Sequence, residues 1–208
     1  MRSILHRITA TALLLLTAGM ATSPSIACGF DGILGDGFSA EHPRSIAVAF
    51  AISDAVAAGI VDKTAVTPIV PGSSGYWRAV GRISALHRLF AAASIADGDA
   101  PAISLLFIDS KLWARFSPEP QGYALQVHAP GASPGDVVIV TSEAILAAVL
   151  DGTMAAKRAL DLGLIAIDGE PNRTAATRDL LVSAADRVKG VAVTGAPATL
   201  VRAFGPAH

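Results

Sequence analysis

Four short apolar segments follow one another along the middle of this 208-residue chain, and they constrain the fold more than any other feature. Residues 102–109, 112–116, 123–129 and 136–141 are rich in aliphatic and aromatic side chains, and turn-forming residues separate them. Such lengths and boundaries are typical of β-strands, and the short connections favour antiparallel neighbours. A fifth short strand is predicted at 164–168.

Helical patterns flank these strands on both sides. A helix over 45–59 is predicted, with Ser45 as its N-cap and Gly59 as its stop. A long helix is predicted over 76–96, where apolar residues recur every three to four positions. Further helices are expected at 143–150 after the cap Ser142, at 154–162, and from about 172 to 188. Because the strands are grouped and the helices surround them, the sequence indicates an α+β fold.

The first 27 residues are predicted to be a secretory signal peptide. Arg2 and Arg7 provide a basic start, an apolar run follows over 11–20, and Ser25 and Ala27 are the small residues that a signal peptidase reads. The apolar run is shorter than the roughly 20 residues of a membrane-spanning helix. We therefore expect a periplasmic or secreted mature protein.

Cleavage after Ala27 would leave Cys28 at the new N-terminus, where lipoproteins carry their lipid. Cys28 is therefore a candidate lipidation site, although Ser25 stands where a leucine is usual; a soluble periplasmic protein is the alternative. A membrane contact is expected only through such a lipid. Cys28 is also the only cysteine, which excludes an intramolecular disulfide and a cysteine-based zinc site.

Acidic residues in the turn-rich stretch that follows Cys28 leave a metal-binding alternative open. Asp31, Asp36, Glu41 and His42 lie among several glycines, as in an oxygen-rich cation loop. Their spacing does not match an EF-hand. Glycine and aspartate are also the common residues of ordinary turns, so the segment has two interpretations.

Charge and motif spacing argue against nucleic-acid binding and catalysis. The formal net charge is −1 and the basic residues are scattered, so no nucleic-acid partner is expected. His42, His87 and His128 lack ligand spacing, and no phosphate loop or Ser–His–Asp arrangement is evident. The Pro-Gly-Ser-Ser-Gly stretch at 71–75 is interpreted as a linker. We expect a protein with no cofactor and no enzymatic activity, in which His87 is a packed residue on an apolar helix face.

Three glycines interrupt the segment DGTMAAKRALDLGLIAIDGEP at 151–171, and their spacing carries a family resemblance. Gly152 and Gly163 are predicted to end two helices with positive φ, and Gly169 follows the last strand. Residues 136–181 resemble the sterol carrier protein 2 (SCP2) family, which has a capped helix, a short helix with a small central residue and a strand between glycines. The positions that carry the resemblance are Ser142, Glu143, Leu146, Leu150, Gly152, Ala159, Gly163, Ile165, Ile167 and Gly169.

The resemblance extends over about 76–188, with less distinctive features upstream such as Trp113 in the second strand. Leu164 and Ala166 depart from the family pattern where basic and polar residues are frequent, and Pro171 is expected to shorten or redirect the entry to the closing helix. The resulting domain organisation is a signal peptide (1–27), a turn-rich and helical extension (28–75), an SCP2-like domain (76–188) and a C-terminal tail (189–208).

The resemblance implies a five-stranded, mostly antiparallel sheet with helices over one face and an apolar tunnel between them. Sterols, fatty acyl chains or isoprenoid tails are the ligands of such a tunnel, and the transfer of hydrocarbon out of water would drive their binding. An ordinary filled core would contain the same residues as the tunnel. The candidate lining residues are Leu105, Phe107, Trp113, Phe116, Leu125, Ile145, Val149, Leu160 and Ile167.

Three functions are consistent with these patterns. The first is an exported, non-enzymatic protein that holds a lipid or another apolar small molecule between sheet and helices. The second is a periplasmic accessory module with a filled core, whose residues 28–75 dock to an envelope protein. The third is a periplasmic metal-binding protein that uses the acidic residues of 31–42.

Overall fold

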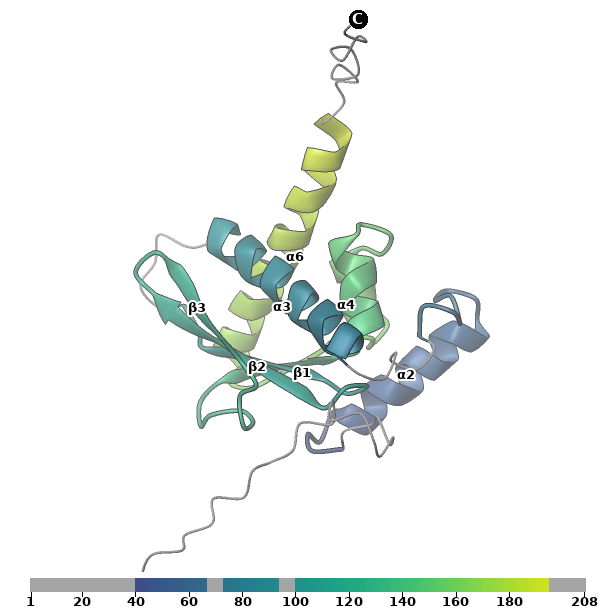
Figure 1. Cartoon of the computed structure of the whole chain (residues 1–208), viewed down its shortest axis with the longest axis horizontal. Coiled ribbons are helices and arrows are strands. Elements are labelled where there is room, and N and C mark those ends of the chain that lie inside the picture. The colour runs from purple at the N-terminus through teal and green to yellow at the C-terminus, as the bar shows by residue number, and fades with distance from the viewer. Residues whose placement is uncertain (1–39, 67–72, 94–99, 195–208) are drawn as a thin grey trace, which may run out of the picture.

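The computed structural model describes residues 40–66, 73–93 and 100–194, and these form one α+β arrangement (Figure 1). The elements follow in the order α2 (Ser45–Ala57), α3 (Ser73–Ala93), β1 (Ile103–Phe107), β2 (Leu112–Glu119), β3 (Gly122–Val127), β4 (Val137–Thr141), α4 (Glu143–Leu150), α5 (Ala156–Asp161), β5 (Ala166–Asp168) and α6 (Pro171–Thr194). The α+β class predicted from the grouped strands is confirmed.

The five strands form one sheet in the order β3-β2-β1-β4-β5. β1, β2 and β3 are antiparallel neighbours, as are β4 and β5. The expectation that β3 and β4 would also be antiparallel neighbours was wrong, because β4 pairs in parallel with β1. All five residues of β1 and of β4 are buried, and strands buried on both sides belong in the centre of a sheet.

Strand alternation divides the side chains of the sheet between two faces. Ile103, Leu105 and Phe107 of β1 pack into a large cluster with α3, α4, α5 and α6, whereas Leu106 faces the other side. The helices α3, α4 and α6 lie together on one side of the sheet in Figure 1, and the C-terminal part of α6 projects beyond the body. We call the buried residues between the sheet and these helices the apolar layer.

Helix α2 packs against the opposite face through its N-terminal half, whereas Ala55 near its C-terminal end is buried in the apolar layer. Its Val48 belongs to a second, smaller cluster with Leu106, Trp113, Val138 and Val140. In Figure 1, α2 lies away from the other helices, near the end of the sheet. The sheet therefore carries α3, α4, α5 and α6 on one face, and α2 contacts both the smaller cluster on the other face and the apolar layer.

Local capping explains where α4 and α6 begin. Ser142 has extended backbone angles and its hydroxyl accepts a hydrogen bond from the Ile145 N–H at 3.3 Å, as predicted for an N-cap. Pro171 does not shorten the entry to α6, because it is the first residue of that helix, a position that tolerates proline. The Glu170 carboxylate accepts the N–H groups of Asn172 and Arg173, both at 3.1 Å, and so caps the helix.

The glycines at the ends of α4 and α5 have the predicted left-handed conformation. Gly152 (φ 73°) and Gly163 (φ 72°) each follow the C-cap residue of their helix. This is the position at which a left-handed residue ends a helix, and side chains other than glycine are strained there.

Several predicted boundaries were displaced. Helix α3 begins at Ser73, so the end of the expected linker 71–75 is helical, and α6 runs past 188 to Thr194. Ser45 is the first helical residue rather than the cap, because Arg44 has the N-cap position and makes no side-chain capping bond. Among the described residues, no helix combines the length and the apolar character needed to cross a bilayer.

Candidate ligand-binding site

The apolar layer contains eight of the nine residues predicted to line a tunnel. Six of them are buried in the layer, and Leu125 and Ile167 are partly buried and pack against it. The six are Leu105, Phe107, Phe116, Ile145, Val149 and Leu160. Whether these side chains bind a ligand stays a prediction.

Trp113 is a correction to the predicted lining. It belongs to the cluster on the α2 face, and its indole N–H donates to the Glu41 carboxylate at 2.8 Å. Its neighbours Leu112 and Ala114 belong to the apolar layer, so strand alternation places Trp113 on the other side of the sheet. The predicted lining included both Trp113 and Phe116, although residues three apart in a strand point to opposite faces.

Aromatic rings fill the apolar layer between α3 and the strands β2 and β3. Phe90 packs edge-on to Phe116 with ring centroids 5.4 Å apart, and Tyr123 lies 5.9 Å from Phe90. His87 stacks on Phe116 at 6.3 Å, and its Nε2 contacts the carbonyl oxygen of Tyr123. His87 is therefore a packed residue, as its place on the apolar helix face indicated.

The hydroxyl of Tyr123 is a buried polar group with no hydrogen-bond partner among the residues that the structure describes. Burial raises the pKa of this phenol to about 12, so it stays protonated at neutral pH. A buried hydroxyl without a partner loses about 1–3 kcal/mol of solvation. It gives the apolar layer one unused hydrogen-bonding group.

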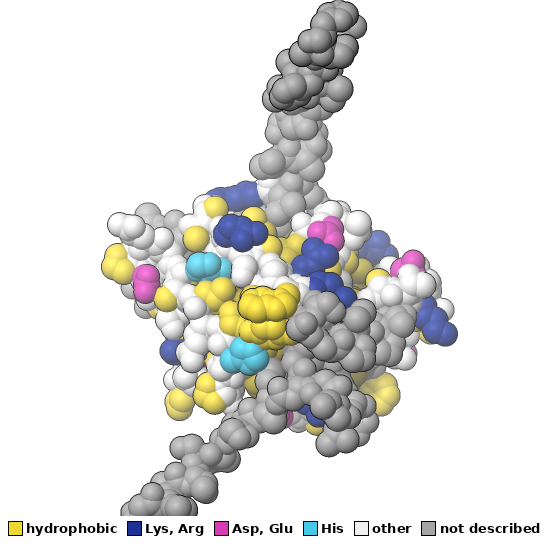
Figure 2. All heavy atoms as spheres, in the orientation of Figure 1, with side chains coloured by type: hydrophobic (Ala, Val, Ile, Leu, Met, Phe, Trp, Pro, Cys, Tyr) yellow, Lys and Arg dark blue, Asp and Glu magenta, His cyan; other side chains and the backbone are white. Residues whose placement is uncertain are grey.

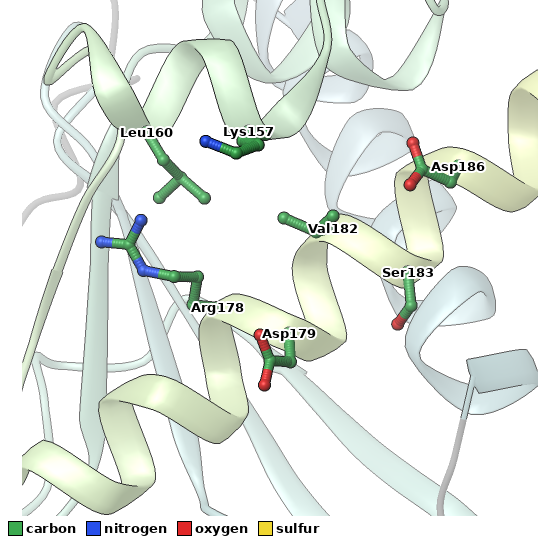
Figure 3. A pocket seen from close by; sticks show the side chains of 7 residues that line it. All are labelled: Lys157, Leu160, Arg178, Asp179, Val182, Ser183 and Asp186. Carbon is green, nitrogen blue, oxygen red and sulfur yellow. The ribbon is translucent and has the colours of Figure 1, made fainter.

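A groove between α5 and α6 opens next to the apolar layer. Its volume is about 380 Å³, near the lower end of the roughly 300–1,000 Å³ of small-molecule pockets. Figure 3 shows the side chains of Leu160 and Val182 pointing toward one another across the gap between the two helices. The lining residues are Lys157, Leu160, Arg178, Asp179, Val182, Ser183 and Asp186.

The floor of the groove is continuous with the apolar layer. Leu160 is a buried member of the layer, and Val182 is a partly buried residue packed against it. Ala156 and Ala159 on α5 and Ala184 and Ala185 on α6 are buried in the same layer. Alanines fill less volume than leucines would, so both helices contribute short side chains to the layer.

Sequence reasoning found only Leu160 among the groove residues. Arg178, Val182 and Asp186 recur every four residues on α6, which the sequence does show. Their position across the groove from Lys157 and Leu160 depends on how α5 packs against α6. No spacing in the sequence contains that information.

A second group of polar residues joins α3, α4 and the β1–β2 turn. Arg78 donates to the buried carboxylate of Glu143 at 2.6 Å and 3.4 Å. The Asp109 carboxylate accepts the Glu143 N–H at 3.0 Å and 3.2 Å. Burial raises the pKa of Asp109 to about 6, against the effect of these hydrogen bonds. Each polar contact holds an element of the fold in place, and none of these groups faces the groove.

The metal-binding alternative finds no assembled site in the described part of the chain. There, no group of three or more His, Cys, Asp or Glu side chains is placed to hold a metal ion. Glu41 accepts from Trp113, and His42 lies 3.5 Å from the Asp168 carboxylate. Cys28, Asp31 and Asp36 lie outside the described residues, so lipidation of Cys28 and the acidic loop stay predictions.

No protein-family model matches the sequence, and no curated protein matches it. Among solved structures, a UbiJ-SCP2 ubiquinone synthesis protein is similar, with 8% identity over 54% of this chain and 98% of its own chain at a TM-score of 0.37. Sterol carrier protein 2 like 2 from Aedes aegypti has 16% identity over 49% of this chain and 94% of its own, at a TM-score of 0.36.

The inverting sec-alkylsulfatase Pisa1 from Pseudomonas sp. is also similar, with 15% identity at a TM-score of 0.33. The match covers 38% of this chain but only 12% of the sulfatase. The solved structures thus include SCP2 and SCP2-like domains, the family that the sequence resembles, but they are distant.

Proposed function

We propose that this protein is an exported, non-enzymatic domain that binds a lipid or another apolar small molecule through the α5–α6 groove. The observation that carries the proposal is the continuity of the groove floor with the apolar layer. Leu160 and Val182 belong to both, so a hydrocarbon chain that enters the groove meets side chains of the core. Each Å² of apolar surface removed from water would contribute about 25 cal/mol to binding.

Two features of the layer are consistent with this role. The alanines that α5 and α6 contribute to the layer fill less volume than larger apolar side chains would. The Tyr123 hydroxyl, buried and without a partner in the described residues, is a group that a polar atom of a ligand would satisfy. Export is supported by the basic start, apolar run and small residues of 1–27.

Extraction of the purified mature protein, followed by mass spectrometry of the bound lipids, tests this function directly. Titration with fatty-acid and isoprenoid probes would accompany it. We expect Val182→Phe, which fills the groove, to weaken probe binding at least tenfold. Ala176→Phe on the exposed side of α6 is the matched control and should leave binding unchanged. An empty protein that also fails to bind every probe would contradict the proposal.

An accessory or interaction module is the second candidate, and exposed apolar side chains favour it. Trp77 on α3 is 65% exposed, and Ile46 and Phe50 on α2 are 55% and 67% exposed. Figure 2 shows hydrophobic atoms gathered at the centre of one face, with histidine side chains close to them. Large exposed apolar groups often mark a protein interface. This candidate requires a filled apolar layer, so the same extraction and titration separate the two functions.

A further inference from the structure

The charged residues of the α5–α6 groove are unevenly distributed along it. Lys157 and Arg178 lie with Leu160 toward one end of the groove, and Ser183 and Asp186 lie toward the other (Figure 3). The Asp179 carboxylate also belongs to the lining, but Figure 3 shows it pointing away from the gap between the helices. One end of the groove therefore carries two cationic side chains, of which Lys157 is paired with Asp161.

Arg178 is the exposed cation available to hold an anion at this end of the groove. It makes no ion pair and no side-chain hydrogen bond within the described part of the chain. Figure 3 shows its guanidinium on the side of Leu160 rather than turned back along α6. A guanidinium presents donors in a fixed fork that matches a carboxylate or a phosphate.

Lys157 is paired, but weakly enough to exchange its partner. Its Nζ lies 2.7 Å from the Asp161 carboxylate, one helical turn along α5, and both side chains are exposed. Such a pair contributes only about 0.3–0.5 kcal/mol. An anion held by Arg178 can therefore replace Asp161 as the partner of Lys157 at little cost.

We propose that the groove selects single-chain amphiphiles with an anionic head, which Arg178 and Lys157 bind while the tail lies on Leu160 and Val182. This inference rests on the proposed function and adds the chemistry of the head group to it. The α6 wall from Arg178 to Asp186 is about 12 Å long, since a helix rises 1.5 Å per residue. A medium-length alkyl chain therefore suits the groove, with Asp186 disfavouring an anion at the far end.

Calorimetric titration of the full mature chain with three ten-carbon probes tests the inference. Decanoate and decyl phosphate carry an anionic head, and 1-decanol has the same tail without charge. We expect both anions to bind about tenfold or more tightly than decanol, and added salt to weaken only the anions. Inorganic phosphate should not compete measurably, because without a tail it lacks the apolar contact with Leu160 and Val182.

Single substitutions then assign the selectivity to the groove. Arg178→Gln should lower decanoate affinity about tenfold, or about 1.4 kcal/mol, and leave decanol unchanged. Lys157→Gln should have a smaller effect in the same direction. Arg158→Gln removes an exposed charge on α5 outside the groove lining and is the control. Circular dichroism would confirm that each variant is folded.

Equal affinity for decanoate and decanol, or an unchanged decanoate affinity in Arg178→Gln, would overturn this inference and leave the proposed function standing. An equal loss in Arg158→Gln would also overturn it, because the attraction would then be general rather than local. Failure of decanol and both anions to bind would contradict the proposed function itself, and the inference with it.

Discussion

The indole N–H of Trp113 donates to the carboxylate of Glu41 at 2.8 Å, and this bond joins the segment before α2 to the sheet. The Asp168 carboxylate on β5 lies 3.5 Å from His42 and 3.8 Å from Arg44. These two residues, which follow Glu41 in the chain, thus attach the same segment to the sheet a second time. The α2 helix is thus held at its N-terminal side by polar contacts, and by Val48 in the small apolar cluster.

Trp113→Phe should loosen α2 without disturbing the apolar layer. The ring remains apolar, but the hydrogen bond to Glu41 is lost, and we expect about 1–2 kcal/mol of destabilisation in urea unfolding. Hydrogen exchange measured by mass spectrometry should become faster in 45–57 and stay unchanged in α3. Trp77→Phe, at an exposed position, is the control and should change stability by less than about 0.5 kcal/mol. Uniformly faster exchange would show that Trp113 does not act locally.

The buried carboxyl of Asp109 should make stability depend on pH between about 4 and 6. Burial raises its pKa from 3.8 in the unfolded chain to about 6. In that range the folded protein binds one proton more than the unfolded chain. The stabilisation that comes from the protonated Asp109 carboxyl is therefore present at low pH and lost as pH rises through about 6. Asp109→Asn removes the charge and keeps an oxygen acceptor for the Glu143 N–H.

We expect Asp109→Asn to stabilise the protein at pH 8 by about 1–3 kcal/mol and to have little effect at pH 4. Urea midpoints measured at pH 4, 6 and 8 check this. Asp151→Asn, which alters an exposed partner of Arg82, is the control and should keep the wild-type pH dependence. If Asp109→Asn kept that dependence too, another group would be responsible.

Arg115 is expected to stabilise the ionised form of the buried Asp136 carboxylate. Burial acts to raise the pKa of Asp136, but hydrogen bonds from Arg115 and Ser104 outweigh it and lower the pKa. Arg115→Met would leave the carboxylate without its cation and should cost about 2–3 kcal/mol in urea unfolding. Arg115→Met combined with Asp136→Leu should recover part of the loss, because no unpaired charge remains. A double variant no more stable than the single one would refute this explanation.

The sequence predicted the number and the approximate place of the described strands and helices because each carries a local signal. Ser142 capped α4 as expected, and the apolar runs gave β1 to β4. The parallel pairing of β4 with β1 was missed because local turn lengths indicate only which strands are near in sequence. The near-continuous apolar runs ISLLF and VVIVT were the clue that the sequence offered, because strands buried on both faces have such runs.

The candidate site was less accessible to sequence reasoning than the fold. Apolar runs mark core positions but do not by themselves divide them between two faces. Trp113 and Phe116 are three residues apart in β2, so a regular strand places them on opposite faces. The groove depends on side chains of two helices that meet only through tertiary packing. Arg178 has no local signal that distinguishes it from other exposed arginines of α6.

Gly163 and Gly81 form a matched pair that tests the role assigned to the glycine spacing. Gly163 has φ 72° after α5, and a Cβ there would lie 3.6 Å from the Ala51 Cβ, which is an ordinary contact. The cost of Gly163→Ala is therefore the left-handed backbone, about 1–2 kcal/mol. Gly81 lies inside α3, where a Cβ would meet no atom within 4 Å.

Gly81→Ala should stabilise the protein by about 0.5–1 kcal/mol, because alanine favours a helix more than glycine does. The two variants add the same methyl group, so opposite shifts of the urea midpoint isolate backbone conformation as the cause. Gly163→Asn should lose less than Gly163→Ala, since asparagine tolerates the left-handed region better. Equal effects of alanine at both glycines would mean that Gly163 is not required to end α5 at this point.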